Sequence, residues 1–183
     1  MNAPADSTPV LASEHSEDTE PPERFDAALI EEAGDWSVFP TRDSLVTHIA
    51  STMERHPPCA RLRGRSANVV LADDELVRTL NRTYRHKDSP TNVLSFPFEE
   101  SPNSGDPGHL GDVVLALETV LREAADQSLP PEHHFQHLVV HGLLHLIGFD
   151  HEVEADAVEM ETLETRILGE LGIPDPYTLM QSD

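Results

Sequence analysis

The segment that decides the fold of this 183-residue chain is His141-Gly-Leu-Leu-His-Leu-Ile-Gly-Phe-Asp-His151. Its apolar residues continue the pattern of the preceding stretch, which predicts a helix over residues 132–147 that is apolar on most sides. A helix of this kind lies in the middle of a fold. We therefore expect the rest of the chain to pack around it, and we expect Gly148 to end it.

The spacing of three histidines in this segment predicts a metal site. His141 and His145 are four residues apart, so their side chains project from one face of the helix about one turn apart. A turn at Gly148 brings His151 round as a candidate third ligand. Three neutral imidazoles leave a fourth position for water, which is typical of a catalytic metal site. The metal lowers the pKa of that water toward ~7.

The alternative for a buried histidine is an ordinary core residue with hydrogen-bonded nitrogens. Burying three imidazoles without partners is costly, so the spacing favours the metal site for these three residues. For His133, His134 and His137, near the helix start, we expect contact with solvent or with the surroundings of the metal ligands. The sequence assigns no role to His109.

The ligand spacing also raises an alternative function. H-x3-H-x5-H, with a glycine seven residues after the first histidine, is the arrangement of the metzincin proteases. Such proteases carry glutamate directly after the first histidine as the general base. Gly142 occupies that position here. A metallopeptidase therefore remains an alternative, but one that lacks its base.

Hydrophobic patterns outside this helix predict a single α+β domain. Strands are expected over residues 24–31, 66–72, 91–97 and 110–117, and helices over 41–54, 75–84, 118–128 and 153–171. Thr41 and Asp73 are candidate helix caps. Tyr84 should share an apolar face with Leu76 and Leu80, and Val158 should lie on the buried face of the last helix.

The ends of the chain differ from this domain. Residues 1–22 are rich in proline, serine and acids, so we expect a disordered acidic extension before a domain over 23–178 and a tail over 179–183. The single cysteine, Cys59, cannot form an intramolecular disulfide. The N-terminus lacks a signal-peptide pattern, and no apolar run approaches the roughly 18 residues of a membrane span. These features predict a soluble, cytoplasmic protein.

Charge is distributed unevenly along the chain. The 34 acidic and 12 basic residues give a net charge of −22, which by itself argues against binding to nucleic acids or anionic membranes. Residues 36–98, however, carry a net charge of +3, whereas residues 99–183 carry −16. The distribution permits one basic entrance for an anionic ligand on a body that otherwise repels it.

The second informative segment runs from a helix end through a basic turn into a strand: Asn81-Arg-Thr-Tyr-Arg-His-Lys-Asp-Ser-Pro-Thr-Asn-Val-Leu-Ser-Phe-Pro97. Arg85 and Lys87 are cations in a short loop, and the planar guanidinium of arginine suits a phosphate group. Asp88 is placed to orient Arg85 or to brace the turn. Asn92 and Ser95 offer polar groups along the strand. An ordinary surface turn is the alternative interpretation.

Both segments resemble signatures of one family, the YbeY endoribonucleases, which are bacterial rRNA maturation factors. Residues 141–151 resemble its H-G-x-L-H-L-x-G-[YF]-D-H signature, residues 84–97 resemble its second signature, and Leu110-Gly-Asp112 resembles a third. The resemblance runs from about residue 24 to residue 178 and leaves out the acidic extension.

The resemblance implies a fold and a site. The fold would be a single α+β domain, in which a mixed four-stranded sheet packs with helices around a metzincin-like metal site. One zinc ion would be bound by His141, His145, His151 and water. Arg85 falls on the functional arginine of the family and would be the catalytic residue. Lys87, Asn92 and Ser95 are the accompanying candidates for substrate binding.

The resemblance also implies an activity: metal-dependent cleavage of single-stranded RNA. The expected roles are maturation of the 16S rRNA 3′ end, ribosome biogenesis and late quality control of 70S ribosomes. The expected partners are rRNA, the small ribosomal subunit, a small-subunit ribosomal protein and the Era GTPase, with no membrane. A second alternative is a ribosome-assembly binding protein whose metal is only structural, which would bind RNA without turnover.

Overall fold

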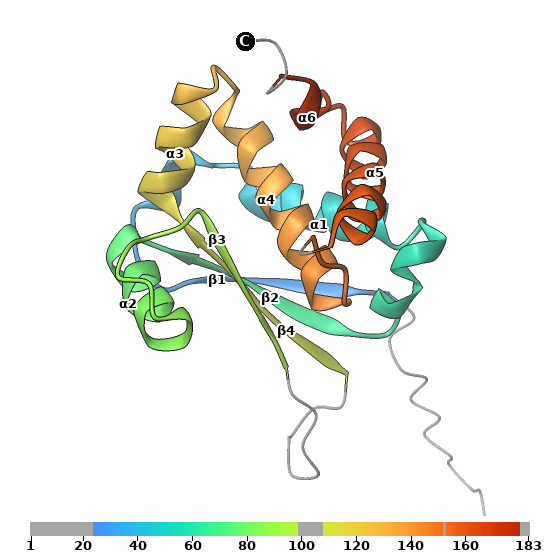
Figure 1. Cartoon of the computed structure of the whole chain (residues 1–183), viewed down its shortest axis with the longest axis horizontal. Coiled ribbons are helices and arrows are strands. Elements are labelled where there is room, and N and C mark those ends of the chain that lie inside the picture. The colour runs from blue at the N-terminus through green and yellow to red at the C-terminus, as the bar shows by residue number, and fades with distance from the viewer. Residues whose placement is uncertain (1–23, 99–107, 152, 180–183) are drawn as a thin grey trace, which may run out of the picture.

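The structure, a computed structural model, describes residues 24–98, 108–151 and 153–179 (Figure 1). The expected disordered extension over 1–22 and nearly all of the expected tail lie outside the described residues. Across the described ranges, no helix combines the length and the apolar character that crossing a membrane requires.

Four strands form one mixed sheet, as the resemblance to the family implies. In chain order they are β1 (Asp26–Glu31), β2 (Ser66–Ala72), β3 (Val93–Pro97) and β4 (His109–Ala116). Their order in the sheet is β1-β2-β4-β3. The first three strands in this order run parallel, and β3 pairs antiparallel with β4. Antiparallel β3 is thus an edge strand among the described residues.

Helices cover both faces of this sheet, unequally (Figure 1). The helices are α1 (Arg42–Met53), α2 (Asp74–Arg85), α3 (Leu117–Asp126), α4 (Pro131–Leu146), α5 (Glu154–Glu170) and α6 (Pro176–Leu179), with short 3-10 helices over Trp36–Val38 and Pro57–Leu62. The larger core holds residues of α1, α3, α4 and α5, and a smaller core lies under α2. The predicted α+β fold class is confirmed.

Helix α4 is the central helix, as its apolar sequence predicts. It packs against α1, α3 and α5 and also against β3 and β4. Phe135, near its start, is fully buried with its ring centroid 5.3 Å from that of Phe39 and 6.0 Å from that of Trp36. These aromatic contacts therefore fix the start of the helix that carries His141 and His145.

The end of α4 turns as expected. Gly148 has φ +100°, a left-handed conformation that favours glycine. The Gly148 and Phe149 amides donate to the carbonyls of His145 and Leu144, at 3.0 and 3.1 Å. Arg61 Nη1 donates to the carbonyl oxygen of Ile147 at 2.8 Å. These bonds pair carbonyl groups at the end of the helix. The chain then turns back toward α4, which places His151 beside His141 and His145.

Of two predictions about helix faces, one is wrong. Val158 of α5 is 59% exposed, because the buried face of this helix is instead made by Met160, Leu163, Glu164, Ile167 and Leu168. The shared face of Leu76, Leu80 and Tyr84 is confirmed, because the two leucines pack with Phe96 against the smaller core and the Tyr84 ring packs against Phe96. Tyr84 is nevertheless 65% exposed, and the residues that α2 buries are Val77 and Asn81. The amide of Asn81 donates to the Ser89 carbonyl at 2.7 Å, so a polar residue takes a core-facing position.

The caps and the C-terminal segment also differ in part from expectation. Asp73 caps α2 as predicted, with its carboxylate accepting from the Leu76 amide at 2.8 Å. Thr41 makes no capping bond, and its hydroxyl donates instead to Glu132 at 2.9 Å, which ties the start of α1 to α4. The end of the domain forms the short helix α6 (Pro176–Leu179), for which the sequence patterns predicted no helix.

Helix α4 packs closely against strand β4 at Gly142. A Cβ atom built on Gly142 would lie 2.3 Å from Cγ1 and 3.0 Å from Cγ2 of Val113 on β4. Real Cβ atoms do not come this close to a neighbour, so any side chain at position 142 would push the helix from the strand. Glycine here sets the distance between α4 and the sheet.

We predict that Gly142→Ala lowers the free energy of unfolding by about 1–3 kcal/mol, the range for overpacked cores. Chemical denaturation of the metal-free protein measures this. Gly169→Ala is the matched control, since nothing lies within 4 Å of a Cβ there and alanine should stabilise the helix by about 0.5–1 kcal/mol. Adding Val113→Ala should restore part of the loss. Equal stability of Gly142→Ala and wild type would contradict the packing argument.

Candidate metal centre and cleft

The structure brings the three predicted ligands together. The Nε2 atoms of His141 and His145 are 3.1 Å apart, and the His151 ring centroid lies 5.5 and 5.0 Å from the centroids of those two rings. One nitrogen of each residue lies within 4.8 Å of the others. Two nitrogens bound tetrahedrally at about 2.0–2.1 Å are about 3.3 Å apart, so the donor set fits one metal ion.

Hydrogen bonds at the far ring nitrogens orient two of these imidazoles. His145 Nδ1 donates to the Phe149 carbonyl oxygen at 2.9 Å, and His141 Nδ1 donates to Glu164 Oε1 at 3.2 Å. In both rings this leaves Nε2 with its lone pair toward the cluster. Burial, followed by the neighbouring His141 and His151, lowers the pKa of His145. The neutral form that a metal requires is therefore favoured.

A buried carboxylate, Glu164 of α5, lies directly behind the ligands. Its side chain is fully buried, its Oε1 lies 3.4 Å from His137 Nε2, and its Oε2 accepts from the Tyr177 hydroxyl. Burial opposes ionisation, but hydrogen bonds from His137 and His141 outweigh it and lower the pKa of Glu164 to about 2. Glu164 is thus an anion that links α5 to His137 and His141 of α4 and to Tyr177 of α6.

Glu164 is not among the residues predicted from the sequence. A usable signal was present, since Glu164 lies between the apolar residues Leu163 and Ile167 on the core-facing side. A lone acid on an apolar helix face requires a partner. The expectation for His137 included a place beside the ligands, and the contact with Glu164 puts it there.

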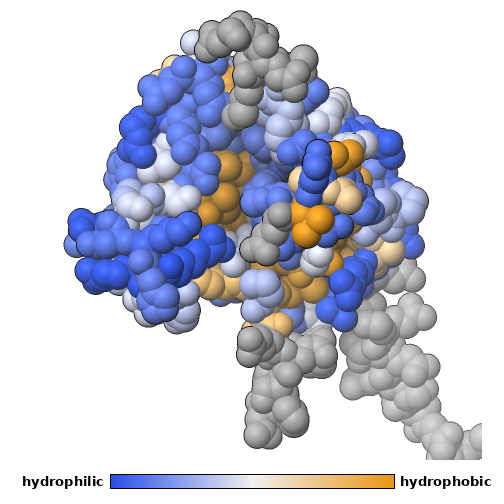
Figure 2. All heavy atoms as spheres, in the orientation of Figure 1, coloured by the Kyte–Doolittle hydropathy of each residue, from blue (hydrophilic) through white to orange (hydrophobic). Residues whose placement is uncertain are grey.

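The histidine cluster opens into a cleft of about 750 Å³. The cleft is lined by Arg85, Thr91, Asn92, Val93, Ser95, Pro97, His141, His145, Gly148, Phe149, Asp150 and His151. Figure 2 shows the hydrophilic surface of α2 and, between α2 and α4, exposed apolar atoms. Arg85, Asn92 and Ser95 thus share one cavity with the ligands, whereas Lys87 is exposed and is not among the lining residues.

Arg85 is available to an anion in this cleft. Its side chain is exposed and makes no hydrogen bond or ion pair within the part of the chain that the structure describes. Asp88 does not orient it, contrary to one expectation. The Asp88 carboxylate instead receives bonds of 2.8 and 3.0 Å from Arg78 and lies 3.8 Å from Arg82, so it braces the turn. The Arg78 bond lowers the pKa of Asp88.

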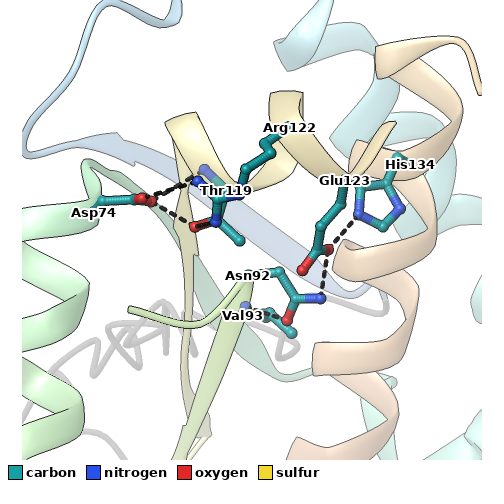
Figure 3. Close-up of polar contacts among 7 residues, drawn as sticks. All are labelled: Asp74, Asn92, Val93, Thr119, Arg122, Glu123 and His134. Atoms are coloured by element: carbon teal, nitrogen blue, oxygen red, sulfur yellow. Dashed lines mark hydrogen bonds and ion pairs between the residues drawn. The ribbon is translucent and has the colours of Figure 1, made fainter. Parts of the chain in front are cut away.

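Asn92 and Ser95 have protein partners in the cleft wall. The Ser95 hydroxyl donates to the Gly142 carbonyl oxygen at 3.2 Å, which links β3 to α4. Asn92 donates from Nδ2 to Glu123 Oε2 at 2.8 Å and accepts from the Val93 amide at 2.7 Å (Figure 3). These bonds fix the position of the wall. Contact of either residue with a substrate stays a prediction.

Glu123 of α3 links Asn92 in the cleft wall to His134 of α4. The same oxygen that accepts from Asn92 lies 2.8 Å from His134 Nε2 (Figure 3). His134 is only 4% exposed, so solvent contact, one expectation for this residue, is wrong. Burial lowers the pKa of His134, although the bond to Glu123 acts in the opposite direction. Glu123 thereby joins β3, α3 and α4 at one end of the cleft.

The geometry bears on both alternative functions. The position that holds the general base in a metzincin protease is Gly142, and Val113 leaves no room there for a glutamate side chain. The three imidazoles line an open cleft together with Arg85. This arrangement suits an anionic substrate better than it suits peptide hydrolysis or a closed structural metal site.

Comparisons with known proteins agree on one family. A family model described as Endoribonuclease YbeY matches residues 39–172. Endoribonuclease YbeY of Azorhizobium caulinodans is 46% identical over 156 residues, covering 82% of this chain and 94% of that protein. For the same protein of Parvibaculum lavamentivorans the identity is 47% over 159 residues, covering 81% and 83%. For that of Rhodospirillum rubrum it is 57% over 114 residues, covering 60% and 57%.

A solved structure has the same fold. It is the solution structure of a protein from Thermotoga maritima, with a TM-score of 0.51 and 23% sequence identity over 86% of this chain and 97% of that one. At this identity the likeness supports the arrangement of the sheet and helices. It adds nothing about the chemistry of the cleft.

We predict that Glu164→Gln weakens metal binding about tenfold to a hundredfold, the usual effect of removing a carboxylate that orients a ligand histidine. Competition with a chromophoric chelator measures the affinity of the purified protein for zinc. Glu159→Gln is the matched control, because it removes the same charge from an exposed position of the same helix. Equal zinc affinity of Glu164→Gln and wild type, with both folded, would show that Glu164 does not support the site.

Proposed function

The chain belongs to the endoribonuclease YbeY family, and from this membership and its cleft we propose that it is a zinc-dependent endoribonuclease that cleaves single-stranded RNA. One observation carries the proposal: an arginine without a protein partner among the described residues faces the same cavity as three converging imidazoles. Cleavage of an RNA phosphodiester is accelerated by a cation that offsets charge on the phosphate and by a metal that activates water or polarises a phosphoryl oxygen. This cavity offers residues for each.

We assign the metal to His141, His145 and His151, which offer three nitrogens on one side of the cluster. Nitrogen ligands with an open fourth position are the donor set of catalytic zinc. A zinc ion held there supplies a Lewis acid for a phosphoryl oxygen and lowers the pKa of a bound water. The protein holds two of the rings by their outer nitrogens, so the ligands are pre-oriented before RNA enters.

Arg85 is the proposed catalytic residue. Its guanidinium donates to two phosphate oxygens at once and offsets the negative charge that builds on the phosphate during cleavage. Lys87, outside the cleft lining, would add positive charge near the entrance. Asn92 and Ser95 keep one donor or acceptor each for the RNA beyond the bonds that hold them in the wall.

We further propose the biological role that the resemblance implies. The enzyme would act in the cytoplasm on the small ribosomal subunit, in 16S rRNA 3′-end maturation, ribosome biogenesis and late quality control of 70S ribosomes. A small-subunit ribosomal protein and the Era GTPase would be its partners. The acidic surface supports this proposal, because an enzyme with few free cations gains little affinity from RNA alone and needs docking on a partner.

Arg85→Ala should retain the metal and reduce RNA cleavage at least a hundredfold, by analogy with the loss of one donor to a transition-state oxyanion, about 10²–10³ in kcat. Cleavage of a structured RNA with single-stranded tails and metal analysis of the same sample test this. Arg166→Ala, an exposed arginine outside the cleft, is the control. Normal cleavage by Arg85→Ala would remove this residue from the mechanism.

His145→Ala should lose both bound zinc and RNA cleavage, because two imidazoles do not complete the donor set. Metal analysis by mass spectrometry and the RNA assay are the readouts, with His48→Ala, an exposed histidine on α1, as the control. Casein is offered to the zinc form in parallel. Hydrolysis of casein without cleavage of RNA would favour the peptidase, and RNA binding without turnover would favour the assembly protein.

A further inference from the structure

An exposed aromatic side chain stands next to the cleft and takes no part in the chemistry described above. Tyr84, on the last turn of α2, is 65% exposed, and its ring packs edge-on against Phe96 of β3 with the centroids 5.3 Å apart. A second pair follows, in which Phe98 packs edge-on against His109 at 5.7 Å. A large aromatic ring that packs against one neighbour and remains 65% exposed offers a surface on which a base can stack.

The strand between Tyr84 and the cleft has a free edge. The carbonyl of Asn92 and the amide of Phe98 bond to β4, so in an antiparallel ladder the backbone groups of Val93, Ser95 and Pro97 point away from it. No described strand pairs with that edge. The side chains of the same three residues line the cleft. The edge of β3 therefore forms the rim between the cleft and the face that carries Tyr84.

This rim is poorly suited to a protein strand. An added strand needs alternating donors and acceptors along the edge. Here the Val93 amide already donates to the Asn92 side chain, and proline at 97 has no amide hydrogen. Ser95 offers the remaining outward amide of β3. The edge is thus mostly acceptors, which suits the amino groups and 2′-hydroxyls of an RNA strand better than a peptide ladder.

The cation that would hold a phosphate adjoins the exposed ring in the sequence. Arg85 directly follows Tyr84 and lines the cleft, so one turn of helix presents a guanidinium and an aromatic face to neighbouring spaces. The nearby acid Asp88 is neutralised by Arg78 and does not repel a phosphate backbone at this point. The positive charge of Arg85 and the exposed ring of Tyr84 thus lie next to each other near the edge of β3.

We propose that Tyr84, supported by Phe96, is a stacking site for an unpaired RNA base next to the nucleotide whose phosphate Arg85 holds. The strand would leave the cleft over the edge of β3 and place one base on the open face of the Tyr84 ring. A paired base has its faces covered by its neighbours, so the site selects single-stranded RNA. This inference rests on the proposed RNA cleavage and adds a binding subsite to it.

Three substitutions at one position test the proposal. Tyr84→Ala removes the ring, Tyr84→Leu keeps apolar bulk against Phe96 without an aromatic face, and Tyr84→Phe keeps the face. With single-stranded RNA we expect KM to rise about tenfold for Ala and Leu, as loss of one base–aromatic stack does elsewhere. We expect kcat to change less than twofold, and the Phe variant to match wild type. Val158→Ala, an exposed apolar residue on α5, is the control.

A spectroscopic signature separates stacking from a structural role. A 2-aminopurine base is moved position by position along an RNA oligonucleotide, and its fluorescence is read on mixing, before cleavage. One position should be quenched by wild type and by Tyr84→Phe and should remain bright with Tyr84→Ala and Tyr84→Leu. Equal KM values and equal quenching for all four proteins would overturn the stacking site while leaving RNA cleavage intact. Absence of cleavage by wild type would instead overturn the proposed function itself.

Discussion

The close contact of α4 with the sheet at Gly142 is the constraint on which the rest of the structure depends. The glycine lets the helix backbone meet Val113, and the Ser95 hydroxyl bonds the Gly142 carbonyl from the neighbouring strand. His141 and His145, two of the proposed metal ligands, lie on either side of this contact on the same helix, so the contact sets their distance from β3. Packing requires that position 142 have no side chain. For the same reason the chain lacks the glutamate that a metzincin protease carries there as its base.

Two carboxylates connect α4 to the surrounding layers, and a third is neutralised near the cleft. Glu164 draws α5 and α6 under the ligands, and Glu123 draws α3 toward β3 and the start of α4. Asp88, exposed in the turn after α2, accepts two hydrogen bonds from Arg78. In a chain with 34 acidic residues, these pairings keep negative charge in hydrogen-bonded positions near the cleft. Arg85 is left without a described partner and faces the cavity.

Much of the fold could be predicted because local patterns specify it. The apolar run of α4 required burial, β2 has the predicted bounds of residues 66–72, and Asp73 caps α2 as expected. A prediction failed on α5, where the buried face leaves out Val158 and includes Glu164. Periodicity finds an amphipathic helix but not which neighbours complete its face.

By itself the sequence determined the α+β class, because hydrophobic patterns along the chain distinguish helices from strands. It also determined the family, the histidine ligand candidates and the candidate arginine, because these depend on residue type and short spacing along one helix or turn. Only the tertiary structure decided which groups lie behind them. Glu164, Glu123 and Tyr177 come from segments distant in the chain, and no local spacing reports that their side chains meet the ligands or the cleft wall. The free edge of β3, likewise, is a property of strand order in the sheet, which is settled only when all four strands pack together.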